Sequence, residues 1–496
     1  MNFRNSVIIL PLFLSGCMVG PDYTKPSAPT PAAYKEATNW KHAQPKDDVI
    51  RGKWWEIYHD QQLDELEDQV NISNQNVLQA EAQFREAAAL VKVTRAGLFP
   101  TVTASPAYTE SQSSQSLTTH PDFGPHVGAV TQGLYNLPVE ASYMVDIWGA
   151  VRRNVEANSA TAQASFADLE NARLSYQATL AQDYFSLHGI DAEKQLLDTT
   201  VSAYEKSLEL TTNRYNSGIA SKADVAQAKT QLETTKAQLI DLGVQRAQFE
   251  HAIATLIGKP ASVFSLSEIP LMATPPQVPL AVPSILLERR PDIAGAERRI
   301  ASANATIGVQ TAAYYPSITL SGSTGLEAIQ LSELFSGPSF FWSVGPVLAQ
   351  TLFDAGKTHG QVQEAQANYE ATVATYRQTV LTAFQQVEDD LAGLRILENE
   401  ADVQDEAVKA AQQSLDIATN QYKAGTEDYL QVITVQTIAL NDEVTAVNIR
   451  TRRMTTSVLM IEALGGGWDV SQLPSSHGVA NVSEAQKQIA KAKIAK

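Results

Sequence analysis

Apolar residues recur at every seventh position along two long stretches of the chain, residues 149–215 and 356–422. Neither stretch contains an internal proline, so nothing forces a break in a helix. A sustained seven-residue period is typical of helices that pack as coiled coils, and each stretch would reach roughly 100 Å as one helix. A plain helical bundle or a cytoskeletal coiled coil would show the same pattern. The apolar rows are Phe166, Leu180, Leu187, Val201, Leu208 and Tyr215, and Val373, Val380, Val387, Leu394, Ala401, Val408, Leu415 and Tyr422.

The first row is broken by Arg173 and Lys194, and a neighbouring row in the same stretch is broken only by Asp183. Just before each stretch the period changes to two, over residues 135–147 and, less cleanly, 340–352. We expect partner strands at about 101–110 and 317–326, which gives a β-hairpin before each long helix. These hairpins argue against a plain bundle and against a cytoskeletal coiled coil.

Strands of about ten residues with one apolar face fit a membrane-spanning sheet, although a strand of a β-sandwich would look similar. The apparent export signal described below favours the membrane. Four strands cannot close a barrel alone, so a membrane-spanning sheet would need several chains.

The two halves of the chain resemble each other. Residues 78–103 match residues 294–319, and residues 213–219 match residues 420–426, in the same order and at a nearly constant offset. We therefore expect an internal two-fold repeat, in which a helix, a hairpin, a very long helix, a glycine-containing turn and a shorter return helix follow one another. The first helix of each copy is expected at about 60–97 and about 290–314.

This pattern divides the chain into six parts. They are a lipoprotein signal peptide (1–16), an acylated N-terminal tether (17–59), a first repeat (60–258), an inter-repeat linker (259–289), a second repeat (290–467) and a C-terminal tail (468–496).

The single cysteine, Cys17, follows Arg4, the apolar run of residues 7–14, and Ser15-Gly16. This order is typical of a bacterial lipoprotein signal, in which the thiol is acylated and the chain is cut before it. An ordinary signal peptide with an incidental cysteine is the alternative. No later run reaches the roughly 18 apolar residues of a transmembrane helix.

The formal net charge of −17 argues against nucleic acid as a partner, because binding phosphates needs clustered Lys and Arg. We find no phosphate-binding loop and no nucleophile motif, so we expect neither an enzyme nor a cofactor other than the lipid on Cys17. His120 and His126 lie six residues apart, and a metal site would be the alternative; we expect them to be exposed surface histidines and no metal to be bound.

Taken in order, the motifs of this chain resemble the TolC superfamily, specifically the outer-membrane lipoprotein factors of tripartite efflux systems, of the OprM and NodT type. The resemblance covers residue 17 to about residue 469. The motifs are CMVGPDYT (17–24), WW (54–55), DIWGA (146–150), RYNSGIASKADV (214–225), LERRPDIA (287–294), SVGPV (343–347), FDAGK (353–357) and QYKAGTEDYLQV (421–432).

The resemblance implies a mainly α chain with a β-barrel part, assembled as a homotrimer. Each chain would give four strands to a twelve-stranded barrel in the outer membrane, and the helices would form an α-barrel through the periplasm. The partners would be a periplasmic adaptor (a membrane fusion protein), an inner-membrane pump and outer-membrane lipid. The implied function is a passive exit duct for small molecules such as drugs or toxic compounds. The duct of a type I protein-secretion system, and a lipid-anchored scaffold without a pore, are the alternatives.

In the family the turns between paired helices form the periplasmic tip, where the adaptor docks. The resemblance therefore implies a tip made of Tyr215, Gly218, Ser221 and Asp224 at one turn and Tyr422, Gly425, Glu427 and Asp428 at the other. Plain structural roles are compatible with this: the glycines as helix stops with positive φ, and Asp224 as a helix cap. The positions of the archetype's paired carboxylates hold Gln431 and Thr434 here, so an acidic ring at the tip would need Asp224, Glu427 or Asp428.

Overall fold

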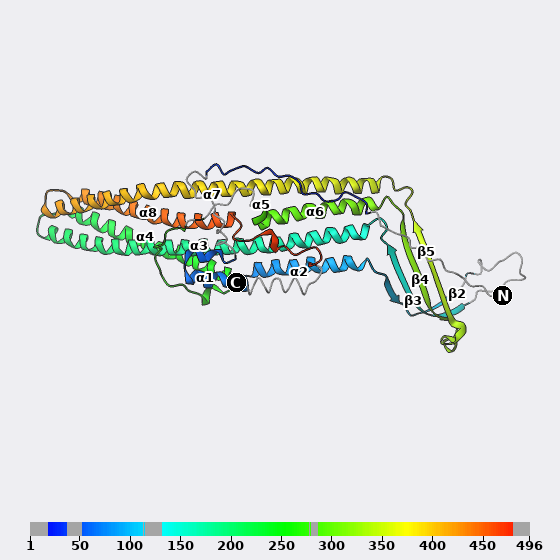
Figure 1. The fold of residues 1–496 in the computed structure, drawn as a ribbon. Coiled ribbons are helices and arrows are strands. Elements are labelled where there is room, and N and C mark those ends of the chain that lie inside the picture. The colour runs from blue at the N-terminus through cyan, green and yellow to red at the C-terminus, as the bar shows by residue number, and fades with distance from the viewer. Residues whose placement is uncertain are drawn as a thin grey trace, which may run out of the picture. The chain divides into compact units, whose positions relative to one another are not determined.

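The computed structural model describes residues 18–36, 52–112, 114, 131–276, 278 and 286–479, which form a mainly helical chain with one antiparallel sheet (Figure 1). Its contacts separate two compact units. Of the described residues, those up to Lys25 and those within Ala87–Ala162 and Arg298–Val373 form the sheet unit. The described residues within Pro26–Glu86, within Gln163–Glu297 and from Ala374 onward form the helical unit.

Two helices of 67 and 68 residues, α3 and α7, confirm the long helices expected from the seven-residue period. Val380 and Val387 of the second row are fully buried in the single chain. No helix in the described part of the chain is long and apolar enough to cross a membrane. The α-helices are α1 (Gln61–Ser73), α2 (Gln75–Ala96), α3 (Ala150–Asn216), α4 (Lys222–Leu256), α5 (Leu286–Arg289), α6 (Pro291–Ala312), α7 (Lys357–Ala424) and α8 (Tyr429–Ala463). Short 3-10 helices lie at Trp54–Tyr58, Ala261–Val263, Leu331–Glu333, Gly337–Ser339 and Val470–Gln472.

The single helix expected over residues 60–97 is wrong, because Asn74 divides it into α1 and α2. Asn74 has an extended backbone, with φ −63° and ψ 121°. Its Oδ1 accepts hydrogen bonds from the backbone N–H groups of Asn76 and Val77, at 2.9 and 3.1 Å, and so caps α2. Its Nδ2 donates to the carbonyl oxygen of Leu256 at the end of α4. A short polar side chain thus offers the backbone an alternative to the continuous helix.

The sheet has the order β1-β3-β4-β5, and β2 also pairs with β3. All pairs are antiparallel. β1 and β2 pair with successive parts of β3, so they are the expected first strand interrupted at Ser105 and Pro106. Proline lacks the N–H that a continuous ladder needs. The strands are β1 (Thr101–Ala104), β2 (Ala107–Gln112), β3 (Thr131–Val145), β4 (Ser317–Ala328) and β5 (Phe340–Ala349).

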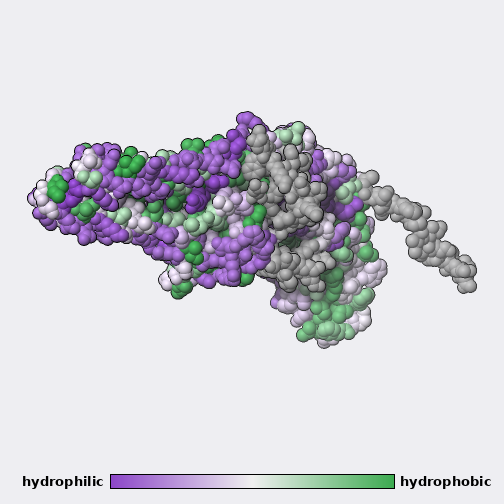
Figure 2. All heavy atoms as spheres, turned by 60° about the vertical axis from the view of Figure 1, so that its left-hand side comes forward, coloured by the Kyte–Doolittle hydropathy of each residue, from purple (hydrophilic) through white to green (hydrophobic). Residues whose placement is uncertain are grey.

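The sheet surface in Figure 2 carries mostly hydrophobic residues, whereas the long helices in view carry mostly hydrophilic ones with isolated hydrophobic patches. On β5, Phe340, Trp342 and Val344 alternate along the strand and are all exposed in the single chain. Alternation of large apolar side chains on one face is the pattern expected of a strand that faces lipid.

The internal repeat is visible in contacts that recur after a shift of 207 residues. Asp191 pairs with Arg246 at 2.8 Å, and Glu398 pairs with Arg453 at 3.9 Å (191 to 398 and 246 to 453). The helix ends repeat as well, with a shift of 216 residues for the donor (74 to 290) and 207 for the acceptor (256 to 463): Asn74 donates to Leu256 O before α2, and Arg290 donates to Ala463 O before α6. The two copies therefore share tertiary contacts and not only a sequence pattern.

Candidate functional site

The turns α3–α4 and α7–α8 lie at the same end of the helical unit (Figure 1). Each helix ends at a glycine with a left-handed backbone, Gly218 with φ +75° and Gly425 with φ +79°. The N–H of the next residue returns to the helix, from Ile219 to Arg214 O and from Thr426 to Gln421 O. This is the Schellman pattern that satisfies the last carbonyl groups of a helix, and glycine adopts it without a Cβ penalty.

The helix that follows each turn begins with a side-chain cap. Ser221 and Asp224 form a reciprocal capping box, with bonds of 3.1 Å from Asp224 N to Ser221 Oγ and 2.9 Å from Ser221 N to Asp224 Oδ2. Asp428 caps α8 by accepting from Gln431 N at 3.1 Å. Both carboxylates therefore stand at helix N-termini, where the helix dipole favours negative charge. Glu427 is exposed beside them.

Arg214 ties the two turns together. Its Nη1 donates to the Lys423 carbonyl oxygen at 3.1 Å, and its guanidinium lies 4.7 Å from the centre of the Tyr422 ring. The Tyr422 ring in turn packs against the Tyr429 ring, with centroids 5.2 Å apart. We call this set, Arg214, Tyr422, Lys423 and Tyr429, the turn clasp. The clasp joins the end of α3 to the end of α7 and the start of α8.

A small apolar cluster shares Tyr422 and Tyr429 with the clasp and extends from them into the helical unit. Tyr429 is buried and its hydroxyl lies 3.0 Å from Ser207 Oγ of α3. Burial raises the pKa of Tyr429, and hydrogen bonds from Ser207 and Thr211 oppose that rise. The cluster consists of Ala228, Tyr422, Tyr429 and Val432, with Leu208, Leu210 and Ile433 packed against it.

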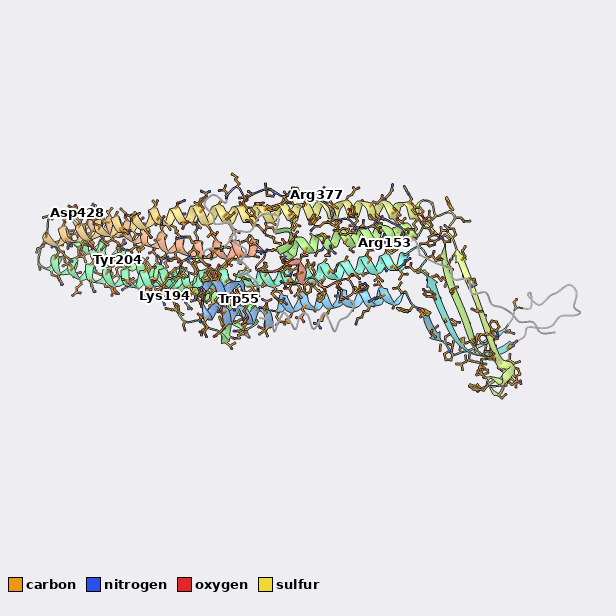
Figure 3. The ribbon with its side chains drawn as sticks, in the orientation of Figure 1. Trp55, Arg153, Lys194, Tyr204, Arg377 and Asp428 are labelled. Carbon is orange, nitrogen blue, oxygen red and sulfur yellow. The ribbon has the colours of Figure 1, made fainter. Side chains whose placement is uncertain are left out.

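The eight tip residues expected from the sequence divide into buried and exposed members. Tyr422 is only 4% exposed and belongs to the core of the tip. Asp224 is half-buried, and Asp428 lies at the free end of its helix pair (Figure 3). The exposed members are Tyr215, Gly218, Ser221, Gly425, Glu427 and Asp428. Gln431 and Thr434 are exposed on the first turns of α8.

Three residues singled out from the sequence, Cys17, His120 and His126, lie outside the described residues. Among the residues that are described, no group of three or more His, Cys, Asp or Glu side chains could hold a metal ion.

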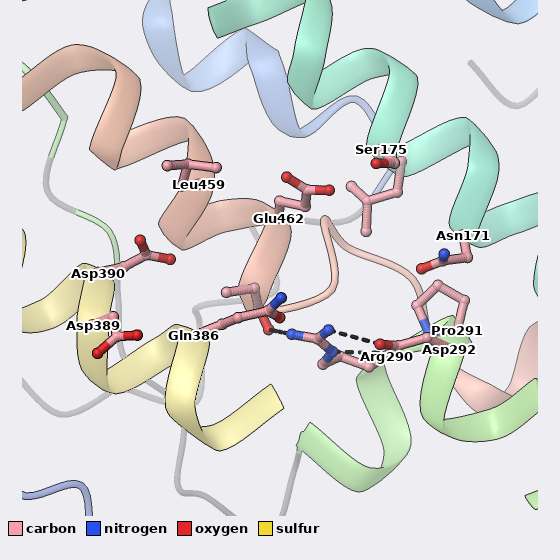
Figure 4. Close-up of a pocket in the computed structure, with 12 residues that line it drawn as sticks. Asn171, Ser175, Arg290, Pro291, Asp292, Gln386, Asp389, Asp390, Leu459 and Glu462 are labelled. Atoms are coloured by element: carbon pink, nitrogen blue, oxygen red, sulfur yellow. Dashed lines mark hydrogen bonds and ion pairs between the residues drawn. The ribbon is translucent and has the colours of Figure 1, made fainter. Parts of the chain in front are cut away.

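A cavity of about 430 Å³ in the helical unit was not expected from the sequence (Figure 4). Arg290 lines it and donates to Asp292 at 2.7 Å and to the Ala463 carbonyl oxygen at 3.0 Å. Burial, with the neighbouring charges of Asp389 and Glu462, raises the pKa of Asp390 to about 7. Burial also raises the pKa of Glu462.

The sequence held one signal for these carboxyls. Asp183, the one break in an apolar row of the first copy, stands 207 residues before Asp390. Burial raises the pKa of Asp183 to about 6. A carboxyl at the same position of both copies, inside an apolar stripe, could have marked a half-buried acid.

The model of the outer membrane efflux protein family matches residues 66–259 and 282–466, which is most of the chain and both copies of the repeat. The chain belongs to this family. This outer membrane efflux protein combines a sheet that exposes apolar side chains with two helices far longer than those of ordinary globular proteins.

Individual outer membrane efflux proteins match over nearly the whole chain. The toluene efflux pump outer membrane protein TtgC of Pseudomonas putida is 29% identical over 466 residues, covering 93% of this chain and 95% of that protein. The outer-membrane channel OprN has a similar structure, with a TM-score of 0.84 at 27% identity over 91% of this chain and 100% of that one. VceC of Vibrio cholerae has a TM-score of 0.77 at 27% identity, over 84% and 99%.

Proposed function

We propose that this chain is one subunit of the outer-membrane exit duct of a tripartite efflux system, a passive conduit for small molecules. The observation that carries the proposal is the family match over both repeats, on a fold that joins a sheet with an apolar face to helices of 67 and 68 residues. The names of relatives such as TtgC, an efflux pump protein, favour efflux over type I protein secretion. The duct itself needs no catalytic group and no cofactor.

The sheet supports a homotrimer. It leaves β5 unpaired along one edge and β1 and β2 unpaired along the other, within the described residues. Open edges with exposed apolar side chains are unfavourable in a membrane, where every backbone group needs an internal partner. Three chains would close twelve strands into a barrel, an even number in antiparallel order.

The paired turns are the proposed contact with a periplasmic adaptor, through which an inner-membrane pump would deliver its substrates. Tyr215, Ser221 and Glu427 are exposed there, and Asp224 and Asp428 add charge at helix N-termini. Gly218 and Gly425 shape the turns, and Tyr422 supports them from within.

A lipid on Cys17 would anchor the chain to the outer membrane. The residues that follow Cys17 are held firmly: Val19 N donates to Trp148 O at 3.1 Å, and Arg153 donates to Asp22 at 2.8 Å and to Val19 O at 3.3 Å. The Arg153 side chain is almost fully buried. This attachment, next to the junction of β3 and α3, supports a defined position for the acylated residue.

The duct proposal is tested by single-channel recording. The purified full-length protein should form trimers and give stepwise currents in a planar bilayer. Deletion of its gene in the native host should raise the accumulation of a fluorescent efflux dye and leave the set of secreted proteins unchanged. A protein that neither conducts nor affects dye accumulation would overturn the proposal, and a lost secreted protein would favour the secretion duct instead.

The anchor is tested separately with Cys17→Ser. This substitution should abolish incorporation of labelled fatty acid, because no other thiol exists in the chain. Unchanged labelling would refute acylation at Cys17 and leave the duct proposal standing.

A further inference from the structure

The cavity of Figure 4 holds more negative charge than Arg290 can balance. Asp389 and Asp390 of α7 and Glu462 of α8 line this cavity. Arg290 lines it as well, but its guanidinium already donates to Asp292 through two bonds, of 3.0 and 2.7 Å. Within the described part of the chain, Asp389, Asp390 and Glu462 take part in no ion pair. When all of these groups are ionised, three carboxylates therefore share the cavity without an ion-pair partner.

The cavity lies where the end of α8 meets three other elements. Glu462 accepts a hydrogen bond from Ser175 of α3. The Ala463 carbonyl oxygen accepts one from Arg290, just before α6, at 3.0 Å. Within the described residues no hydrogen bond joins the Asp390 side chain to α8, and the residues of α3 that line the cavity are uncharged. The end of α8 is therefore bonded to α3 and to the start of α6, whereas α7 presents carboxyl groups to the same space.

The first copy has no charged group at the equivalent neighbouring positions. Asp390 corresponds to Asp183 after the shift of 207 residues, so both copies keep an acid at this point of the long helix. The charged neighbours of Asp390 all lack a charged counterpart, the pairs being Asp389 with Gln182, Glu462 with Thr255 and, after the shift of 216 residues, Arg290 with Asn74. The charged surroundings therefore belong to the second copy alone.

This difference sets the pH at which each of the two acids titrates. Burial raises the pKa of Asp183 to about 6. At Asp390 burial is again the largest cause, and the charges of Asp389 and Glu462 raise the pKa further. Arg290 opposes them, and the pKa of Asp390 is raised to about 7. Asp390 therefore gains its charge near neutral pH, beside an acid on the neighbouring helix.

We propose that Asp390 is a pH-sensitive switch that sets how closely the end of α8 packs against α7. While Asp390 is protonated, Glu462 faces an uncharged group across the cavity and keeps its hydrogen bond from Ser175. Once Asp390 is ionised, two carboxylates on neighbouring helices repel each other in a partly buried space, and water has to enter the cavity to screen them. The first copy has no such switch, because Thr255 stands at the position of Glu462. Both helices belong to one chain, so the switch does not depend on the duct proposed above.

A polarity-sensitive label in the cavity tests the switch. Leu459 lines the cavity one turn before Glu462 and is 37% exposed, so Leu459→Cys can be labelled with bimane. In the purified full-length protein, the bimane emission should shift to longer wavelength as the pH rises, with a midpoint near pH 7, because water enters the cavity. Adding Asp390→Asn should abolish this shift. The protein without the Leu459 substitution, taken through the same labelling, controls for a reaction of Cys17.

Two neighbouring carboxyls test whether the midpoint depends on charge. Glu462→Gln removes a charge that raises the pKa of Asp390, so the midpoint should move to lower pH. Asp389→Asn should move it in the same direction, and because Asp389 is exposed, this variant should disturb the packing little. A merely structural role of either residue would leave the midpoint where it is.

The first copy supplies a matched control for the position of the label. Ala252 on α4 corresponds to Leu459 on α8 after the shift of 207 residues. Bimane on Ala252→Cys should show no transition near pH 7, because no second acid faces Asp183 at the position of Thr255. Asp390→Asn should leave the emission of this label unchanged.

The outcomes separate the switch from the duct itself. A Leu459 label that does not respond to pH, or responds equally with Asp390→Asn, would overturn the switch. A midpoint that neither neighbouring variant moves, or the same transition at Ala252, would overturn it as well. Should Leu459→Cys fail to fold, Gln386→Cys gives a second label position, because Gln386 is exposed and lines the cavity from α7. None of these readouts is a current or a dye measurement, so failure of the switch leaves the duct proposal standing, and a chain without conductance leaves the switch testable.

Discussion

The turns of the two repeats have the same backbone and different side-chain surroundings. Gly218 and Gly425 share a left-handed conformation, yet the tyrosine three residues before each is 42% exposed at Tyr215 and 4% exposed at Tyr422. Tyr422 is covered because Arg214 of the first copy lies over its ring. The two repeats therefore share the way in which each helix ends. They differ in their contacts with the other repeat, and these contacts bury Tyr422 but not Tyr215.

Replacing each tyrosine by alanine should give the largest difference in stability between the two turns. Tyr422→Ala removes a buried aromatic ring from the apolar cluster that shares it with the clasp and should cost about 3–5 kcal/mol locally. Tyr215→Ala, at an exposed position, should change stability by no more than about 0.5 kcal/mol. Hydrogen exchange in the first turns of α8 measures the difference. Equal protection in the two variants would show that the clasp does not stabilise the tip.

Arg214→Ala is the next largest expected effect. It removes the hydrogen bond to Lys423 O and the contact with the Tyr422 ring, which together should contribute about 1–3 kcal/mol. The repeat supplies a matched control, since Gln421 occupies the equivalent position and is exposed. Gln421→Ala should leave hydrogen exchange at residues 423–426 unchanged, and Arg214→Ala should accelerate it. If hydrogen exchange were accelerated by Gln421→Ala and not by Arg214→Ala, then Gln421 and not Arg214 would be the residue that stabilises this turn.

Much of this fold follows from local patterns. The seven-residue rows, with no internal proline, predict α3 and α7 almost to their ends, and the period of two predicts the strands. The break at Asn74 was missed although asparagine is a favoured residue at helix N-termini and so carried a local signal. The part that no local pattern reveals is the tertiary hydrogen bond from its Nδ2 to Leu256 O. Pro106 did carry a local signal, since it cannot donate within a continuous strand.

The candidate site was predictable in its backbone and not in its contacts. A glycine in the turn between two helices indicates a positive φ, and Ser221 with Asp224 indicates a capping box. The clasp depends on Arg214 meeting a residue more than 200 positions away, Tyr422, and pattern reasoning assigned Tyr422 only to the tip. Side-chain pairs of such separation become visible only when both repeats are placed in space.

Asp183 and Asp390 occupy the same position of the two copies, and burial raises their pKa values to about 6 and about 7. Because each carboxyl holds its proton more tightly in the folded chain than at its ordinary pKa of 3.8, protonation stabilises the fold. That stability is complete below pH 3.8 and is lost as the pH rises through the folded value. The contribution of these two carboxyls to the melting temperature should therefore fall as the pH rises, up to about pH 6 for Asp183 and about pH 7 for Asp390.

Asparagine variants separate the two groups. Asp390→Asn should flatten the pH dependence of the melting temperature up to about pH 7, and Asp183→Asn only up to about pH 6, because Asp390 also has carboxylate neighbours. The double variant should show both changes. Asparagine variants whose melting temperatures depend on pH just as that of the wild type does would mean that burial does not control these carboxyls.

The smallest expected change in stability comes from variants of Asp428, which distinguish its role as a helix cap from the role of its charge at the second turn. Asp428 caps α8 with one hydrogen bond, whereas Asp224 shares a reciprocal capping box with Ser221 at α4. Asp428→Ala should cost about 1 kcal/mol by loss of the cap, and Asp428→Asn should cost only a few tenths, because asparagine is an equally good cap. Asp428→Asn nevertheless removes the charge that would face an adaptor. If adaptor coupling, measured as dye efflux by the complete system, falls equally in both variants while only the alanine variant loses helix stability, then the charge of Asp428 acts in docking. Full efflux with Asp428→Asn would instead confine this residue to its structural role as the cap of α8.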